Sequence, residues 1–445
     1  MSYLPNTDED RRAMLDALGV ESIDDLFACI PEGVRFRKEM DLPPAMSELE
    51  LVRHMKTLAG RNVSTEEMVC FLGAGAYDHF LPAVVDHMLS REEFYTAYTP
   101  YQPEVSQGTL QVIFEFQTLI SELTGMDVAN ASMYDGATAL MEAALMAGRI
   151  VRRGDRVVVS ESVHPRYRRV LATYLRGLDW DIVEVPAPDG VTDTAALREA
   201  AGEGALAVIV QNPNFFGMLE PVDEISEAAG DAQFVVACDP ISLGVLRPPG
   251  GYGADIVVGE GQPLGNPLSF GGPYLGFFAS GQKHIRRMPG RLIGRTVEVD
   301  GTRGFVMTLQ AREHHIRRDR ATSNICTNEA LNALAATVYL SAMGRRGLRE
   351  VAEQSLQKAH YAARIIDGLK GYRLRYDQPF FKEFVVECDR PAAEVVSALA
   401  GEGILAGLDL GRFYPGMQRS LLVAVTEKRT KDEIDEFAGR LEGLS

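Results

Sequence analysis

The chain has 445 residues, 46% of them hydrophobic and 24% charged, so it can form a large buried core and two or three domains. Its formal net charge of −17 argues against nucleic acid and membrane surfaces as partners, and no apolar run is long enough to span a membrane. Five dispersed cysteines without a CxxC pair predict no metal site, and the polar, acidic first residues lack a secretory or transit signal, so we expect a cytoplasmic protein.

Residues 1–65 are predicted to form a helical arm. Ser22–Phe27 has the pattern of a short capped helix, and Ser47–Leu58 that of a second helix with Ser47 as its N-cap. The arm carries no recognisable chemistry of its own. We therefore expect it to pack on a neighbouring chain or on the main domain.

Residues 66–325 are predicted to form a large α/β domain. A helix over Thr109–Leu123 ends at Gly125, and a second helix covers Ala137–Ile150. Apolar strands follow, separated in part by helices, which predicts a mostly parallel sheet with helices on both faces and ligands at the carboxyl ends of the strands. The predicted strands are Val157–Ser160, Asp181–Val185, Leu206–Gln211, Phe234–Cys238, Ile256–Gly259 and Tyr274–Ala279, and two of the helices between them are Arg166–Leu175 and Val222–Ala229.

Residues 326–445 are predicted to form a smaller α+β domain. Long helical segments over Asn328–Leu369 are broken near Gly344 and Gly347. Three strands and a final helix are predicted at Tyr372–Tyr376, Phe384–Glu387, Leu421–Val425 and Lys431–Leu441.

One loop carries the densest group of polar and aromatic side chains. The prolines in Thr99-Pro100 and Gln102-Pro103 favour an extended backbone, and a helix follows directly, so the loop can present side chains and free N–H groups to a ligand. An ordinary turn with aromatic packing is the alternative. The residues are Tyr95, Tyr98, Tyr101, Gln102, Glu104, Ser106 and Gln107.

A second group of hydroxyl and amide side chains precedes the long helix. These side chains, with the N–H groups at a helix start, suit a phosphate, although Thr327 or Asn328 could simply cap the helix. The arginines before the group form either an interface or a solvated face. The group contains Thr322, Ser323, Asn324, Thr327 and Asn328, and the arginines are Arg312, Arg317, Arg318 and Arg320.

Several long motifs resemble those of the glycine cleavage system P-protein, most of all its separate alpha subunits. These motifs cover essentially the whole chain. They are YLPNT from Tyr3, FLGAGAY in Phe71–Tyr77, YTPYQPEVSQG in Tyr98–Gly108, PGRLIGRT in Pro289–Thr296 and TLQAREHHIRRDRATSNICTNEA within Met307–Ala330.

The resemblance implies a transferase of fold type I, the aspartate-aminotransferase-like fold of enzymes that depend on pyridoxal 5′-phosphate (PLP). It implies a mostly parallel seven-stranded sheet, a smaller C-terminal α+β domain and an N-terminal helical arm. Aligned through Asn266-Pro267 and Gly271-Gly272-Pro273, the family's PLP lysine falls on Gln262. Because an amide cannot form a Schiff base, the resemblance implies that the lysine belongs to a partner.

That partner would be a beta subunit in an α2β2 assembly with PLP at the αβ interface. The activity implied is decarboxylation of glycine, release of CO2 and transfer of the aminomethyl group to the lipoyl arm of the H-protein. The tyrosine-rich loop would line the glycine and PLP pocket, and Thr322–Asn328 would contact the partner's cofactor phosphate. His164 and Asp239 lie where related enzymes place the ring-stacking residue and the carboxylate beside the pyridine nitrogen, so here they would belong to a vestigial pocket.

Two other hypotheses remain open from the sequence. The chain could be a catalytically empty partner that stabilises the beta subunit or docks the H-protein. It could also be a self-contained PLP enzyme with an unexpected lysine, and Lys283 is the lysine nearest the expected segment, although its surroundings are polar. An isolated chain could pair with itself, because the two subunits would share one fold.

Overall fold

The computed structural model describes residues 6–96 and 98–444. Tyr3, Leu4 and Pro5 of the first motif, and Ala97 within the tyrosine-rich region, lie outside the described residues. The chain divides into two compact units, Met1–Val63 and Ser64–Ser445.

The first unit contains short helices whose starts are fixed by side-chain caps. Helix α1 (Asp8–Leu18) begins after Thr7, the 3₁₀ turn η1 (Ile23–Phe27) after Ser22, and α2 (Glu48–Ala59) after Ser47, each with a reciprocal capping box. A further 3₁₀ turn, η2, covers Glu32–Val34. The two predicted helices are therefore confirmed, the first as a 3₁₀ turn. No described residue of this unit is buried.

The centre of the second unit is a mixed seven-stranded sheet. In spatial order the strands are β2 (Val128–Ala129), β8 (Gly276–Ser280), β7 (Ile256–Glu260), β6 (Gln233–Ala237), β5 (Ala205–Gln211), β3 (Arg156–Ser160) and β4 (Asp181–Val185). The strands β7, β6, β5, β3 and β4 run parallel, whereas β8 is antiparallel to both of its neighbours. The six predicted strands are confirmed, and the short edge strand β2 completes the sheet.

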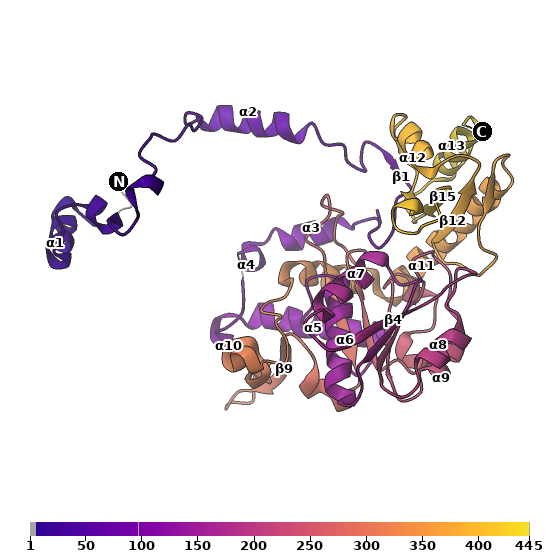
Figure 1. The fold of residues 1–445 in the computed structure, drawn as a ribbon, viewed down its shortest axis with the longest axis horizontal. Helices are drawn as coiled ribbons and strands as arrows, with labels where there is room; N and C mark the ends of the chain where they lie inside the picture. The colour runs from indigo at the N-terminus through magenta and orange to yellow at the C-terminus, as the bar shows by residue number, and fades with distance from the viewer. Residues whose placement is uncertain (1–5, 97, 445) are drawn as a thin grey trace. The chain divides into compact units, whose positions relative to one another are not determined.

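Helices cover both faces of this sheet (Figure 1). Val157 and Ile209 belong to the core under α6 (Gly136–Val151) and α7 (Pro165–Leu175). Val158 and Val208 belong to the opposite core, with side chains from α5 (Gln107–Thr124), α8 (Thr194–Ala200) and α9 (Val222–Ala228). This two-sided burial explains why the parallel strands are apolar throughout.

Local sequence signals fix several helix ends. Asp135 caps the start of α6, and α5 ends at Gly125, whose φ of 69° is left-handed. Beyond the predicted elements, the structure contains α3 (Ala83–Leu89), α4 (Glu92–Tyr95), α10 (His314–Arg317) and an antiparallel hairpin of β9 (Leu292–Val297) and β10 (Arg303–Thr308). Short 3₁₀ turns connect these elements: η3 (Pro103–Val105), η4 (Ser242–Gly244), η5 (Pro249–Tyr252), η6 (Gln282–Arg287), η7 (Gln310–Arg312), η8 (Arg318–Arg320) and η9 (Leu410–Arg412).

The C-terminal part has its own sheet and core. Helix α11 (Ala330–Asp367) has the predicted break at Gly344, where φ is 59° and ψ is −177°. An antiparallel sheet follows in the order β11 (Tyr372–Leu374), β12 (Glu383–Cys388), β15 (Ser420–Ala424) and β14 (Leu408–Asp409), grouped with α12 (Ala392–Ala400) and α13 (Lys431–Glu442) (Figure 1). Strand β1 (Val69–Cys70) pairs with β13 (Ile404–Leu405), which joins the start of the unit to this part. None of the helices in the described residues has the length and apolar character needed to cross a bilayer.

Candidate functional site

The residues of the predicted vestigial pocket meet at the carboxyl ends of the parallel strands. His164 follows β3, Asp239 follows β6, and Glu260 ends β7. Together with neighbouring side chains they enclose a space of about 30 Å³. Such a space holds one or two water molecules, whereas small-molecule sites measure about 300–1,000 Å³. We call this region the inner pocket.

A buried ion pair occupies the inner pocket. Lys382, which directly precedes β12, is 1% exposed, and its Nζ lies 2.7 Å from Oδ2 of Asp239. The same Nζ lies 2.9 Å from Nε2 of His79 and 3.5 Å from the centre of the Tyr77 ring. The carboxylate that would hold a pyridine nitrogen is therefore already neutralised by a lysine of the same chain.

Two further carboxylates complete the network around Lys382. Glu427 lies 2.6 Å from Nδ1 of His79, whose pKa is lowered by burial and by the nearby Lys382. The hydroxyl of Tyr77 donates to Glu383 at 2.7 Å, and burial raises the pKa of Glu383 to about 7. With a neutral imidazole, His79 accepts from Lys382 and donates to Glu427, so each member of the network has a partner.

Gln262, the residue aligned with the family's lysine, is 1% exposed and fully engaged. Its Oε1 accepts from the backbone of Tyr77 at 2.9 Å, and its Nε2 donates to the carbonyls of Tyr77 and Asn266 at 3.1 and 2.8 Å. These bonds hold the segment Gly73–Tyr77 over the pocket. A Cβ at Gly73 would lie 2.4 Å from Glu383, so this close approach requires glycine.

His164 and Tyr167 close the rest of the inner pocket. Their rings stack with centres 4.6 Å apart, and Nε2 of His164 lies 3.0 Å from the carbonyl of Ala74. Burial lowers the pKa of His164 to about 4, so its ring is neutral near pH 7. The inner pocket has almost no free volume, its Asp239 carboxylate is already paired, and the amine of Lys382 is held in that ion pair, so the pocket does not fit PLP.

The predicted tyrosine-rich loop lies open to solvent. Tyr95 at the end of α4, Tyr98 and Tyr101 are 69%, 76% and 57% exposed, and Gln102 and Glu104 are also exposed. Ser106 precedes α5 without a side-chain capping bond. Three exposed tyrosines in one loop are unusual for a packing role, because buried aromatics normally dominate cores.

The side chain of Gln107 is hydrogen-bonded to the backbone of β10. Its Nε2 donates to the carbonyl of Phe305 at 2.9 Å, and its Oε1 accepts from the N–H of the same residue at 2.8 Å. The side chain therefore pairs with β10 as a strand would. It holds the start of α5 against the hairpin.

In the second predicted group, residues 322–328, some side chains are hydrogen-bonded within the chain and others have no partner in the part of the chain that the structure describes. Ser323 donates to Glu142 at 2.7 Å, and Asn328 donates to the carbonyl of Ala131 at 3.1 Å. The side chains of Thr322 and Asn324 have no hydrogen-bond partner within residues 6–96 and 98–444. Helix α11 begins at Ala330 without a side-chain cap, so the alternative that Thr327 or Asn328 caps it is wrong.

Arg291 brings the two predicted groups together. Its guanidinium donates to Thr327, Asn328 and the carbonyl of Cys326 at 3.0, 3.2 and 2.6 Å. The same group lies 5.8 Å from the centre of the Tyr101 ring. We call the surface formed by the described residues of the tyrosine-rich loop (95–96 and 98–107), Arg291 and residues 322–328 the outer face.

Sequence reasoning missed several residues of these two regions. Lys382 and Glu383 interrupt an apolar run from Phe380 to Val386, and charged residues in such a run are a signal that could have been used. Arg291 carried no such signal. Lys283, by contrast, is exposed as predicted and lies 3.4 Å from Asp255, away from the inner pocket.

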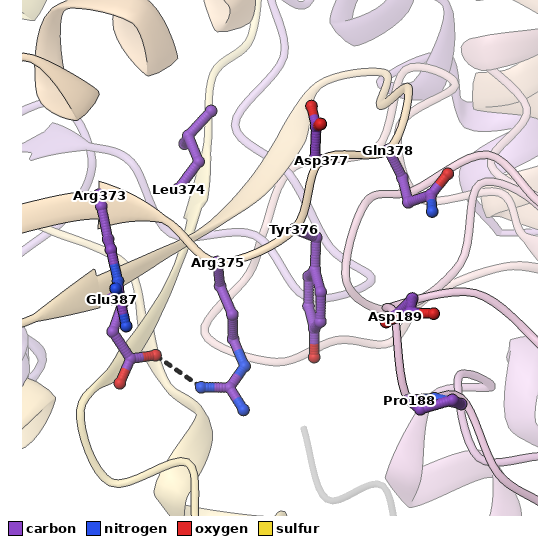
Figure 2. A pocket seen from close by; sticks show the side chains of 9 residues that line it. All are labelled: Pro188, Asp189, Arg373, Leu374, Arg375, Tyr376, Asp377, Gln378 and Glu387. Atoms are coloured by element: carbon purple, nitrogen blue, oxygen red, sulfur yellow. Dashed lines mark hydrogen bonds and ion pairs between the residues drawn. The ribbon is translucent and has the colours of Figure 1, made fainter.

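A separate hollow of about 520 Å³ lies beside the C-terminal sheet (Figure 2). Its lining includes Arg375, Tyr376 and Asp189, and the guanidinium of Arg375 lies 2.6 Å from Glu387. It contains none of the predicted site residues. It therefore does not alter the choice between the inner pocket and the outer face.

Comparisons with known proteins identify the family. The family model described as "Glycine cleavage system P-protein" matches residues 1–441. A probable glycine dehydrogenase (decarboxylating) subunit 1 of Carboxydothermus hydrogenoformans is 56% identical over 445 residues and is covered completely, as is this chain. The protein with the same description from Moorella thermoacetica is 54% identical over 446 residues, again with complete coverage of both chains.

Comparison with solved structures supports the same family. A crystal structure of glycine decarboxylase (P-protein) of the glycine cleavage system, in inhibitor-bound form, matches all of both chains with 44% identity and a TM-score of 0.90. A sphingosine-1-phosphate lyase of Burkholderia pseudomallei, with 15% identity, 93% and 94% coverage and a TM-score of 0.67, shows the shared fold alone. The predicted fold type I of PLP-dependent enzymes is confirmed, and the chain belongs to the glycine cleavage system P-protein family.

Proposed function

We propose that the chain is the subunit of glycine decarboxylase that lacks the Schiff-base lysine. It would act with a lysine-bearing beta subunit, as an α2β2 assembly, in the decarboxylation of glycine and transfer of the aminomethyl group to the lipoyl arm of the H-protein. The family and the description "subunit 1" of its relatives support this proposal. The observation that carries it is the inner pocket, where Lys382 pairs with Asp239 and Gln262 is fully hydrogen-bonded.

PLP bound to the partner would supply the electron sink for decarboxylation. This chain would supply positioning at the outer face. The free side chains of Thr322 and Asn324 would orient a phosphate, and Tyr98 and Tyr101 would close the pocket against water. Arg291 would hold both groups in register, because it bonds residues 326–328 and its guanidinium lies 5.8 Å from the centre of the Tyr101 ring.

The side chains of Ser323 and Gln107 already form hydrogen bonds within this chain, so we assign them a positioning role and no direct contact with the cofactor. The only hydroxyl hydrogen of Ser323 is donated to Glu142, so Ser323 would position the segment instead of donating to a phosphate. Gln107 would likewise hold the loop end through β10. Gln102, Glu104 and Ser106 remain predicted lining residues.

The domain boundaries 1–65, 66–325 and 326–445 and the cytoplasmic location also remain predictions. The main competing function is that of a catalytically empty partner. On that hypothesis the outer face contributes only to assembly or to H-protein docking, and its side chains do not affect turnover.

Turnover of the assembled complex distinguishes the shared catalytic site from the catalytically empty partner. We expect Tyr98→Phe and Asn324→Ala to lower glycine decarboxylation by about tenfold or more, because each removes one polar group from the proposed pocket. Tyr174→Phe is the matched control, since Tyr174 is 49% exposed on α7, far along the chain from the loop.

Assembly would be measured on the same samples by size-exclusion chromatography with light scattering. Reduced turnover with unchanged assembly supports the shared site. Full turnover of both variants would instead favour the catalytically empty partner.

A further inference from the structure

A basic hollow lies next to Thr322. It measures about 330 Å³ and is lined by four arginines and Thr322, together with Leu309 and Ala311, and no carboxylate of the described residues lines it. The arginines are Arg286, Arg312, Arg317 and Arg320. This concentration of positive charge contrasts with a formal net charge of −17 for the chain.

Arg312 forms the fixed floor of the hollow. Its side chain is 9% exposed, and its guanidinium donates to the carbonyls of Met288 and Gly290. Its Nε is buried and has no partner among the described residues. Glu313 lies 3.4 Å from the same guanidinium and is the nearest counter-charge that the structure pairs with it. A buried donor without an acceptor indicates that the floor is not satisfied by this chain alone.

The other arginines keep donors available. Arg317 donates through Nε to the carbonyl of Ala311 at 3.0 Å, which leaves its terminal nitrogens free to bind. The side chains of Arg286 and Arg320 form no hydrogen bond or ion pair with any residue in the described ranges. Because guanidinium groups in one hollow repel each other, an occupant of negative charge would stabilise the arrangement.

The backbone holds this segment in a defined shape. Leu309 and Arg318 have φ angles of 53° and 52°, a left-handed region that costs a non-glycine residue about 1–3 kcal/mol. The two residues bracket the part of the chain that carries Arg312 and Arg317. The sequence left open whether these arginines form an interface or a solvated face. A purely solvated face would not require this left-handed backbone at Leu309 and Arg318.

We propose that this hollow is a binding site for an oxyanion, namely the phosphate group of a small molecule. Arginine guanidinium groups bind phosphate oxygens with paired, charge-assisted hydrogen bonds, and the free hydroxyl of Thr322 adds a donor at the rim. All of the lining residues belong to this chain, and the proposal rests on the proposed function only where the occupant is the partner's cofactor phosphate, which Thr322 is proposed to contact.

Calorimetric titration of inorganic phosphate into the full chain tests the site. We expect one phosphate per chain, and binding about tenfold weaker in Arg286→Gln and in Arg320→Gln. Neither arginine has a partner to lose, so the melting temperature should not change. The control is Arg345→Gln with Arg346→Gln, which removes two exposed charges from α11.

Absence of saturable binding would overturn the proposal. Equal weakening in the control variant would also overturn it, because the effect would then come from net charge. These results leave the proposed function untouched, because that function is measured by turnover of the Tyr98 and Asn324 variants.

The source of the phosphate is distinguished with the assembled complex. If the PLP-loaded complex still binds one inorganic phosphate per chain, the site serves a free phosphate-bearing molecule. If PLP loading abolishes the binding seen in the PLP-free complex, the partner's cofactor phosphate occupies the hollow. Both results keep the oxyanion site and differ only in its occupant, whereas absence of saturable binding to the chain overturns it.

Discussion

The inner pocket and the outer face contain similar residue types, but they differ in how these residues are satisfied. In the inner pocket, His79 and Gln262 are buried, the side chain of Asp239 is only 10% exposed, and all three have partners from the same chain. On the outer face, the side chains of Tyr98, Thr322 and Asn324 have no hydrogen-bond partner among the described residues. Groups that are already paired are structural, and groups left open are available to a ligand or a second chain.

The inner pocket also shows that a position typical of binding sites does not guarantee free volume for a ligand. The inner pocket lies at the strand ends where α/β enzymes bind ligands, yet it encloses only about 30 Å³. The place predicted by topology is therefore filled, and binding chemistry has to be sought on the surface.

The largest expected effect comes from breaking the buried ion pair. Lys382→Met should lower the free energy of unfolding by about 3–5 kcal/mol, because it leaves Asp239 buried without its partner. Adding Asp239→Asn should restore part of this loss, since the unpaired charge is then removed. Urea denaturation of the two variants measures both effects.

Lys370→Met is the control for this experiment, because Lys370 is exposed and should change stability by less than about 0.5 kcal/mol. If Lys382→Met is as mild as the control, Asp239 has another source of stabilisation. The inner pocket would then not be a closed structural network.

Glu383→Gln should change the pH dependence of stability. Burial raises the pKa of Glu383 from its ordinary value of 4.5 to about 7, so its favourable contribution is complete below pH 4.5 and is lost as the pH rises through 7. Relative to wild type, the glutamine variant should gain up to about 3 kcal/mol between pH 4.5 and 8. Denaturation curves across this range measure it, and parallel curves for both proteins would contradict the raised pKa.

Arg291→Lys tests the outer face as a unit. Lysine cannot reproduce the three hydrogen bonds to residues 326–328, so we expect a loss of about 1–3 kcal/mol. Amide hydrogen exchange should rise in both 98–107 and 322–328, because Arg291 joins the two segments. Faster exchange in only one segment would show that they are held independently.

The smallest expected effect is that of Lys283→Ala. The Lys283 side chain is 70% exposed and lies 3.4 Å from Asp255, so stability should change by less than about 0.5 kcal/mol. PLP content of the complex should not change either. Loss of PLP in this variant would revive the hypothesis of a self-contained enzyme.

Local signals in the sequence predicted most elements of the fold. The apolar runs identified six strands, and the caps at Ser47 and Gly125 identified helix ends, because these depend on neighbouring residues. The hairpin β9–β10 was missed, since Gly294-Arg295 and Gly304 interrupt any apolar alternation. The two residues of β2 are too few to give a pattern.

The candidate site was predicted less completely for a different reason. The residue types at Tyr98–Gln107 and Thr322–Asn328 were visible in the sequence, but their meeting through Arg291 depends on tertiary structure. The same holds for the pairing of Lys382 with Asp239. Periodicity and caps describe neighbours along the chain, and they carry no information on which distant side chains meet.

The most direct test of the shared site is borohydride reduction of the PLP-loaded complex with its candidate beta subunit, followed by peptide mass spectrometry of both chains. The account predicts that the reduced cofactor is attached to a lysine of the beta subunit, and that this chain alone acquires none. Reduced cofactor on Lys382, Lys283 or any other lysine of this chain would contradict it.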